Sequence, residues 1–290
     1  MFSLAKIVLP VDFSERSLGA ARYVEALAAR FDSEVLILHV LPPPHYEFSA
    51  LEVGGTMLNE LFAARAKQVR LELDEFRTPE MARIRTRRLV LEGDPARKIV
   101  EFAHAEQAGA IVLPTHGYGP FRRFILGSVT AKVLHDADCP VWTGIHLEQA
   151  PPVDAIRFGN ILCAVDLGPQ SPRALRWAAA LAAEYGARLT IVHAAMCGEP
   201  PLNAAAGEDW ARQITERARD EIEALKRTLG VEAGVEVRTG DAPHLVCDLA
   251  RRLPAELLVI GRGSAAGVFG RLRTNAYAII RQSPCPVVSV

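Results

Sequence analysis

A glycine-rich stretch between residues 114 and 130 has the clearest potential for chemistry. It reads PTHGYGPFRRFILGSVT and follows an apolar run that ends at Leu113. Gly117 and Gly119 let the backbone approach a ligand closely because they have no Cβ. Gly127–Ser128 opens an expected helix whose first N–H groups favour an anion. The stretch is either a phosphate-binding loop or a strand–helix turn in which Ser128 caps the helix.

An acidic residue at the end of the first expected strand adds to this signal. Asp12 follows the apolar run KIVLPV. A carboxylate there can accept hydrogen bonds from ribose hydroxyls, or it can serve as a turn or capping residue before the next helix. Ligands of open parallel sheets bind beyond the carboxyl ends of the strands. A carboxylate and a candidate phosphate-binding loop on the same edge of the sheet together indicate a nucleotide-binding site.

The motif order occurs twice along the chain. KIVLPVDFSERS is similar to NILCAVDLGPQS, which places Asp12 and Asp166 154 residues apart. The later segments CPVWT and CPVVS place Cys139 and Cys285 146 residues apart. A constant order with a slowly drifting offset is typical of a duplicated domain rather than of a solenoid, whose period is about 20–50 residues. We expect domains over 1–147 and 155–290, joined near Pro151–Pro152.

Strand and helix patterns alternate within each half. In the first half the strands are expected over 5–11, 34–40, 83–93, 109–115 and 139–145, and the helices over 14–31, 59–77, 95–107 and 128–136. Continuous apolar runs are typical of strands buried on both faces. Strands separated by helices predict parallel pairing with right-handed crossovers. The predicted fold class is α/β, with two repeated doubly wound domains of five strands and about four helices.

Composition and charge exclude several classes of protein. The 33 basic and 34 acidic residues nearly cancel, so we expect no nucleic-acid partner. Arg83, Arg85 and Arg87 alternate along one expected strand and predict a solvated face. No apolar run reaches the roughly 18 residues of a membrane span, and the N-terminus is typical of a first strand rather than a signal. Five widely spaced cysteines without a CxxC motif favour a cytoplasmic location and no zinc site.

The complete motif order resembles the universal stress protein family in its tandem two-domain form. VDFSERS, the LHV strand end, EGDP, THG and CPV follow the family order over nearly the whole chain. The family's ATP-binding signature is Gly, two residues, Gly, nine residues, Gly, then Ser or Thr. Gly117, Gly127 and Ser128 match its last three elements, whereas Pro114 replaces the first glycine. The resemblance implies ATP, with Mg²⁺, bound without an obvious catalytic base by a regulator of stress responses.

The resemblance also implies a set of contacts in the first half. The residues implied to border the adenosine are Pro10, Val11 and Asp12, with Val40 meeting adenine through its backbone. The residues implied on the phosphate side are Leu113, His116, Gly117, Gly127, Ser128, Val129 and Thr130. Pro114 removes one N–H and fixes φ near −65°, so a contact or a positive φ that glycine provides there is lost.

The second half departs further from the signature. Gly261 aligns with Pro114 and restores the first glycine, but Ser264 stands at the place of Gly117 and Thr274–Asn275 at that of Gly127–Ser128. The sequence therefore predicts a degenerate nucleotide loop in this half. Gly261, Gly263 and Ala266 also fit the dinucleotide fingerprint GxGxxA. That fingerprint follows a first strand and precedes an acidic residue about 20 positions later, and neither condition holds here.

Three functions remain open at this point. The first is an ATP-binding stress regulator, the second a ligand-free scaffold or partner-binding protein of the same fold, and the third a slow ATP hydrolase. His39 and His193 both end second strands, where we expect packed or rim histidines. The apolar fifth strands and the family resemblance imply that the two halves pair within the chain as a pseudo-dimer. A homodimer of chains is a further possibility.

Overall fold

The chain folds into two compact units, as the internal repeat predicts. The computed structural model describes residues 2–43, 55–115, 126–144, 150–195, 204–262 and 274–290. The main bodies of the units are Ser3–Trp142 and Arg157–Val290. Each unit is an α/β domain with a five-stranded parallel sheet, so the predicted fold class is confirmed.

The first unit alternates strands and helices along the sequence. Its strands are β1 (Lys6–Pro10), β2 (Glu34–Leu41), β3 (Thr86–Glu92), β4 (Ala110–Val112) and β5 (Val141–Thr143), in the spatial order β3-β2-β1-β4-β5. Its helices are α1 (Glu15–Phe31), α3 (Gly55–Glu75), α4 (Pro95–Ala105) and α5 (Ser128–Asp136). A 3-10 turn, η2 (Val153–Ala155), follows them. All four strand pairings are parallel.

The second unit repeats this arrangement. Its strands are β6 (Asn160–Ala164), β7 (Arg188–Ala195), β8 (Gly234–Thr239), β9 (Leu257–Ile260) and β10 (Val287–Ser289), in the order β10-β9-β6-β7-β8. Its helices are α6 (Ser171–Tyr185), α7 (Ala204–Leu229), α8 (Ala242–Arg252) and α9 (Thr274–Gln282). The register is repeated as well, since Pro10 pairs with Leu38 and Ala164 with Val192.

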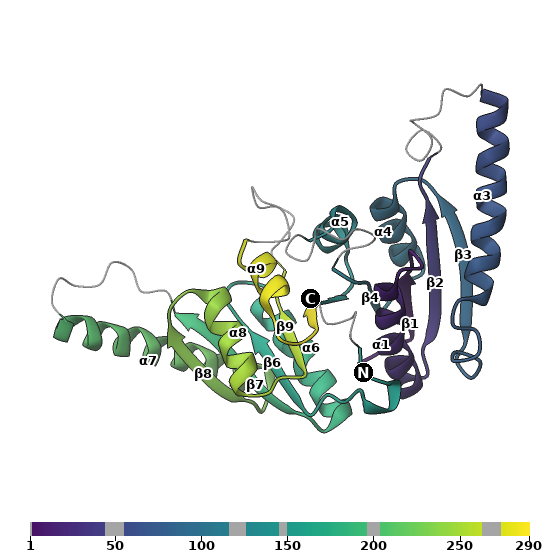
Figure 1. Cartoon of the computed structure of the whole chain (residues 1–290). Coiled ribbons are helices and arrows are strands. Elements are labelled where there is room, and N and C mark those ends of the chain that lie inside the picture. Colours follow the sequence, from purple (N-terminus) through teal and green to yellow (C-terminus); the bar gives the residue numbers. More distant parts are fainter. Residues whose placement is uncertain (1, 44–54, 116–125, 145–149, 196–203, 263–273) are drawn as a thin grey trace. The chain divides into compact units, whose positions relative to one another are not determined.

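Strand order determines where a ligand can bind in each unit. From β1 the chain moves outward through α1 and α3 to β3, then returns through α4 and α5 to β4 and β5. Right-handed crossovers place these two pairs of helices on opposite faces of the sheet. Figure 1 shows α3 running beside β3 and α4 near α5. The order reverses between β1 and β4, and between β6 and β9, and such reversals open a crevice at the carboxyl ends of the strands.

Burial on both faces explains the continuous apolar runs. Ile7, Val8 and Leu9 of β1 are fully buried, as are the apolar residues at the centre of β2. On α1 the buried apolar positions include Ala21, Val24 and Ala28, which are three or four residues apart and form one face of the helix. Among the described helices, none is both long and apolar enough to cross a lipid bilayer.

Several element boundaries differ from the sequence-based expectation, most clearly those of β3, α3 and α4. β3 begins at Thr86 rather than at residue 83, because the Ile84 N–H bonds back to Met81 O in a turn. Arg83, Arg85 and Arg87 are exposed, as predicted. α3 begins at Gly55 instead of residue 59. α4 ends at Ala105 rather than 107, since Gln107 adopts a left-handed φ of 51° that stops the helix.

Candidate functional site

The first unit has a cavity of about 300 Å³ at the carboxyl ends of β1, β2 and β4. Seven of the residues that the family resemblance implies line this cavity: Pro10, Val11, Asp12, Val40, Leu113, Val129 and Thr130. Gly127 and Ser128 lie at the start of α5, next to the last two of these. His116 and Gly117 lie outside the described residues. The structure thus brings together residues from four separate segments of the sequence.

Asp12 is held in a fixed orientation at the rim of the cavity. Its Oδ1 accepts hydrogen bonds from the Ser14 N–H at 3.1 Å, the Ser14 hydroxyl at 2.5 Å and the Ser17 hydroxyl at 2.6 Å. Ser14, not Asp12, is the N-cap of α1. These contacts occupy one oxygen of a half-buried carboxylate, and Oδ2 has no hydrogen-bond partner among the described residues. The turn role of Asp12 therefore leaves an acceptor for a ligand.

The turn after Asp12 contains backbone strain in both units. Phe13 and Leu167 adopt left-handed φ values of 63° and 58°, which non-glycine residues rarely do. The Phe13 ring stacks on His39 with ring centroids 4.9 Å apart. Such strain persists only where the surroundings impose it, and it is concentrated at functional sites. The repeated conformation shows that both halves build the same acidic turn.

His39 and His193 are anchored in the same way. Nδ1 of His39 lies 2.8 Å from Val11 O, and Nδ1 of His193 lies 2.8 Å from Val165 O. Since a carbonyl oxygen only accepts, Nδ1 carries the proton in each case. His193 is buried and His39 is half-buried. Both rings line their cavities, and their contacts secure the strand end that carries Asp12 or Asp166.

The start of α5 lacks the side-chain cap found on its neighbours. Ser14 caps α1 and Asp94 caps α4, each by accepting a backbone N–H. The N-cap of α5 is Gly127, which has no side chain to offer. The alternative in which Ser128 caps this helix is wrong, because Ser128 is its first residue and is exposed. Among the described residues, no side chain caps the first N–H groups of α5, and an anion can satisfy them.

Pro114 joins the end of β4 to α5. Its carbonyl accepts a hydrogen bond from the Thr130 hydroxyl at 2.9 Å, while the Gly127 N–H bonds to Thr115 O at 2.8 Å. The counterpart of Pro114 in the second unit is Gly261, which is not among the residues with a positive φ. A proline at this place in the fold thus loses an N–H but no left-handed conformation.

Arg65 is the main cavity residue that the sequence did not single out. It comes from α3, and its side chain is 36% exposed. Its contact with Glu72 is long, at 3.9 Å. Among the described residues that line this cavity, Arg65 provides the cationic side chain, and Asp12 lines the same cavity. Helical spacing alone could not indicate that this arginine faces the sheet edge.

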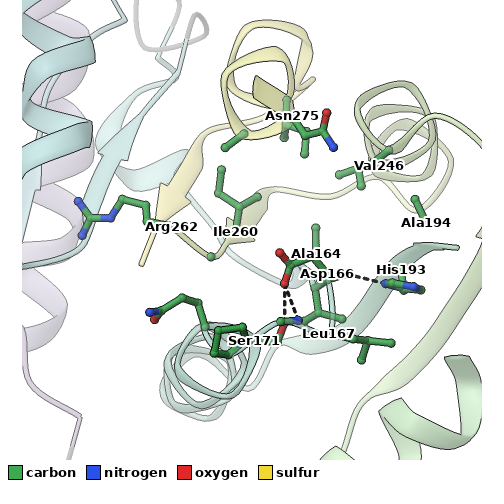
Figure 2. Close-up of a pocket in the computed structure, with 18 residues that line it drawn as sticks. Ala164, Asp166, Leu167, Ser171, His193, Ala194, Val246, Ile260, Arg262 and Asn275 are labelled. Atoms are coloured by element: carbon green, nitrogen blue, oxygen red, sulfur yellow. Dashed lines mark hydrogen bonds between the residues drawn. The ribbon is translucent and has the colours of Figure 1, made fainter. Parts of the chain in front are cut away.

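The second unit has an equivalent cavity of about 480 Å³. Figure 2 shows Asp166 and Ser171 on one side of it and Asn275 and Val246 on the other. Asp166 Oδ1 accepts from the Gly168 N–H at 2.9 Å and the Ser171 hydroxyl at 3.0 Å, much as Asp12 does. A side chain at position 168 would clash with this carboxylate, because a Cβ added to Gly168 would lie 2.9 Å from Asp166 Oδ1.

The position of α9, which borders this second cavity, changes the residue that corresponds to Ser128. α5 and α9 have nine residues each, and their buried positions repeat at an offset of 146: Thr130 and Ala276, Val133 and Ile279, and Leu134 and Ile280. Ser128 therefore corresponds to Thr274, not to Asn275. The signature's final Ser or Thr is retained in the second half, and Arg273 takes the place of Gly127. The one-residue difference arises between β9 and α9.

Comparison with known proteins agrees with the duplicated fold. A universal stress protein of Methanocaldococcus jannaschii is 34% identical over 136 residues, which cover 47% of this chain and 79% of the relative. One from Thermus aquaticus is 34% identical over 140 residues, covering 47% and 94%. The crystal structure of a universal stress protein from Archaeoglobus fulgidus aligns with a TM-score of 0.68 at 24% identity, covering 99% of this chain and 96% of that one.

The family model supports the same assignment independently. It describes the universal stress protein family and matches twice, over residues 4–143 and 157–290. Each match contains one of the two sheets together with its acidic turn and cavity. The chain therefore belongs to the universal stress protein family, in its tandem two-domain form.

Proposed function

We propose that the first half binds ATP and that the protein acts as a cytoplasmic regulator in stress responses. The observation that carries this proposal is the shared cavity of Asp12 and the start of α5. Asp12 provides an oriented hydrogen-bond acceptor. The start of α5 provides backbone N–H groups that no described side chain caps. A ribose and a phosphate need these two features at opposite ends of one ligand.

The remaining cavity residues suit the other parts of this ligand. Val40, Ile99 and Leu113 offer apolar contacts to a flat base. Arg65 adds positive charge, which strengthens hydrogen bonding to phosphate. Mg²⁺ would accompany the phosphates, as it commonly does with nucleotides. Among the described lining residues, the titratable side chains are Asp12, His39 and Arg65, and the first two are engaged in holding the turn.

The most direct test is mass spectrometry of nucleotide released from freshly purified, denatured protein. We expect adenine nucleotide at about one molecule per chain. Calorimetric titration of nucleotide-free protein with ATP should give the same stoichiometry. If no nucleotide is released and none binds, Pro114 has disabled the loop and the ligand-free scaffold becomes the better hypothesis. A hydrolysis assay with Gly127→Val as its control distinguishes slow ATP turnover from binding alone.

We further propose that the two halves pair within the chain as a pseudo-dimer. The support is the apolar last strand of each unit, with Val141 and Trp142 in β5 and Val287 and Val288 in β10. Small-angle scattering of the full chain should fit two paired domains. A profile of two domains without a mutual interface would contradict this arrangement. Light scattering on the same sample would show whether chains also associate into homodimers.

A further inference from the structure

The long helix α3 exposes apolar side chains on a side that its own unit does not bury. Figure 1 shows this helix beside β3, the edge strand of the first sheet. Met57 and Leu71 are 54% and 58% exposed, whereas Val69 and Leu73 of the same helix are buried. At 3.6 residues per turn, the exposed pair and the buried pair lie on different sides of the helix. α3 thus has an apolar surface in addition to the one that packs in its unit.

The exposed apolar residues belong to a stripe with heptad spacing. This outer stripe consists of residues separated by four, three, four and three positions: Met57, Leu61, Ala64, Gln68 and Leu71. Leu61 is half-buried and the other four are exposed. The spacing is that of a two-helix coiled coil, with Leu61 and Gln68 at a and the others at d. A single polar residue at an a position, here Gln68, specifies the register of such a pair.

Charged residues beside the outer stripe are arranged to attract a second copy of the same helix. Glu60 and Lys67 occupy g positions, and Arg65 and Glu72 occupy e positions. In a parallel coiled coil, a g side chain lies next to the e side chain five residues later on the other helix. Glu60 then faces the partner's Arg65, and Lys67 faces the partner's Glu72. An antiparallel pair centred on the stripe would instead bring like charges together, Lys67 with Lys67 and Arg65 with Arg65.

These charged side chains are accessible to a partner helix. Glu60 and Lys67 are exposed, and neither forms an ion pair with another described residue. The Glu72 carboxylate is held beside the stripe, because Gln68 Nε2 donates to its Oε1 at 2.8 Å and Arg65 lies 3.9 Å from the same oxygen. Arg65 also lines the cavity, so the contact between Lys67 and Glu72 is the clearer one to test.

The equivalent helix of the second half does not repeat the outer stripe. Buried positions of α3 and α7 correspond at an offset of 149 residues, from 69 to 218 and from 73 to 222. At this offset polar and charged residues take the places of Ala64, Gln68 and Leu71, namely Gln213, Arg217 and Asp220. The stripe is therefore not a general feature of this helix in the repeated fold.

We infer that the outer stripe of α3 is a self-association surface, through which two chains pair as a parallel two-stranded coiled coil. Each chain offers the same surface to the other, so the interface closes as a symmetric dimer. α3 has 21 residues, the length of three heptads, and its stripe includes a small and a polar residue. We therefore expect a reversible dimer rather than a permanent one. This inference does not depend on nucleotide binding.

The test is sedimentation equilibrium of the full, nucleotide-free chain over a range of concentrations. We expect a reversible equilibrium between the 31.6 kDa chain and its dimer. Ala64→Glu places a charge within the stripe and should raise the dimer dissociation constant by about tenfold or more. Ala63→Glu is the matched control, because it makes the same change at the neighbouring exposed alanine, which lies off the stripe. It should leave the dissociation constant unchanged, and circular dichroism should show both variants folded.

A charge exchange tests the parallel orientation. Lys67→Glu and Glu72→Lys each convert two opposite-charge contacts of the dimer into like-charge contacts, and each should weaken self-association roughly tenfold. When the two variants are mixed, opposite charges face each other again, so the mixture should form heterodimers. A chain that stays monomeric, a dimer that Ala64→Glu leaves intact, or an equal response to Ala63→Glu would overturn the inference. A mixture that associates no better than either variant alone would also overturn it.

Discussion

The Ser17 hydroxyl and Asp12 form a closed pair of hydrogen bonds. Ser17 Oγ donates to Asp12 Oδ1 at 2.6 Å and accepts from the Asp12 N–H at 3.1 Å. The carboxylate is therefore oriented before any ligand arrives, at the junction of β1 and α1. The same serine–aspartate pairing recurs between Ser171 and Asp166 at 3.0 Å. Asp12 thus has two roles: Oδ1 holds the turn, and Oδ2 is available to a ligand.

Asp12→Ala should weaken ATP binding about 10- to 150-fold, because a hydrogen bond to a charged group is worth about 1.5–3 kcal/mol. Calorimetry measures this change. Ser17→Ala is the control for the turn, since it removes the support but keeps the carboxylate. It should lower stability by about 1 kcal/mol and affect affinity less. Unchanged affinity in Asp12→Ala would remove Asp12 from the site.

Gly127→Val should abolish ATP binding while the protein stays folded. The φ and ψ of Gly127 are −62° and 148°, which valine adopts readily, so the effect comes from side-chain bulk at the uncapped helix start. Loss of two charge-assisted hydrogen bonds corresponds to about 3–6 kcal/mol, or roughly 10²- to 10⁴-fold.

Ser128→Val and Thr274→Val form the matched pair for the two halves. The first variant should weaken ATP binding and the second should barely affect it. Two equal ATP sites per chain would refute the asymmetry between the halves, as would loss of binding only on changing the second half.

Arg65→Gln should weaken the binding of ATP more than that of adenosine. Its guanidinium lies at the cavity and is partly exposed, so its contribution comes from charge near the phosphates and should fall as salt is added. Titrations at two ionic strengths would measure it. Arg70→Gln, on the exposed side of the same helix, should change neither affinity. An equal loss for adenosine and ATP would place Arg65 away from the phosphates.

Arg77→Ala should lower the free energy of unfolding by about 3–5 kcal/mol, because it leaves Glu25 as an unpaired buried charge. Glu25 is 4% exposed. Its carboxylate accepts one hydrogen bond from Arg77 Nε and a second, at 2.9 Å, from Arg77 Nη2. This hydrogen bonding raises the pKa of Arg77 further above its usual range. Chemical denaturation provides the measurement. Arg83→Ala, an exposed arginine of the same turn, should cost less than about 0.5 kcal/mol.

The buried cysteines should resist alkylation in the folded protein. Burial raises the pKa of Cys163 and Cys285 to about 12 and that of Cys247 to about 11. Because the thiolate is the reactive form, these groups stay protonated and unreactive at pH 8. In a Cys197→Ser background, iodoacetamide should modify Cys139, which is half-buried, well before the other three. Denaturant should expose all four, and rapid native labelling of Cys163 would contradict this prediction.

The local sequence was sufficient to predict the repeat, the element types and the acidic turns. Apolar runs and helical spacing are short-range signals, and Gly93 and Gly240, which precede α4 and α8, adopt φ values of 137° and 148° that favour glycine. Element boundaries were less predictable. The end of α4 at Ala105 and the late start of β3 depend on turns whose hydrogen bonds the apolar pattern does not reveal.

The composition of each cavity, by contrast, was decided by tertiary structure. The position of Arg65 at the cavity that Asp12 also lines depends on how α3 packs along the sheet, which helical periodicity alone does not determine. The match of Thr274 with Ser128 depends on the buried face of α9, because the loop before it differs in length from its counterpart. Each cavity is lined by side chains from several strands and helices, which come together only when these elements assemble.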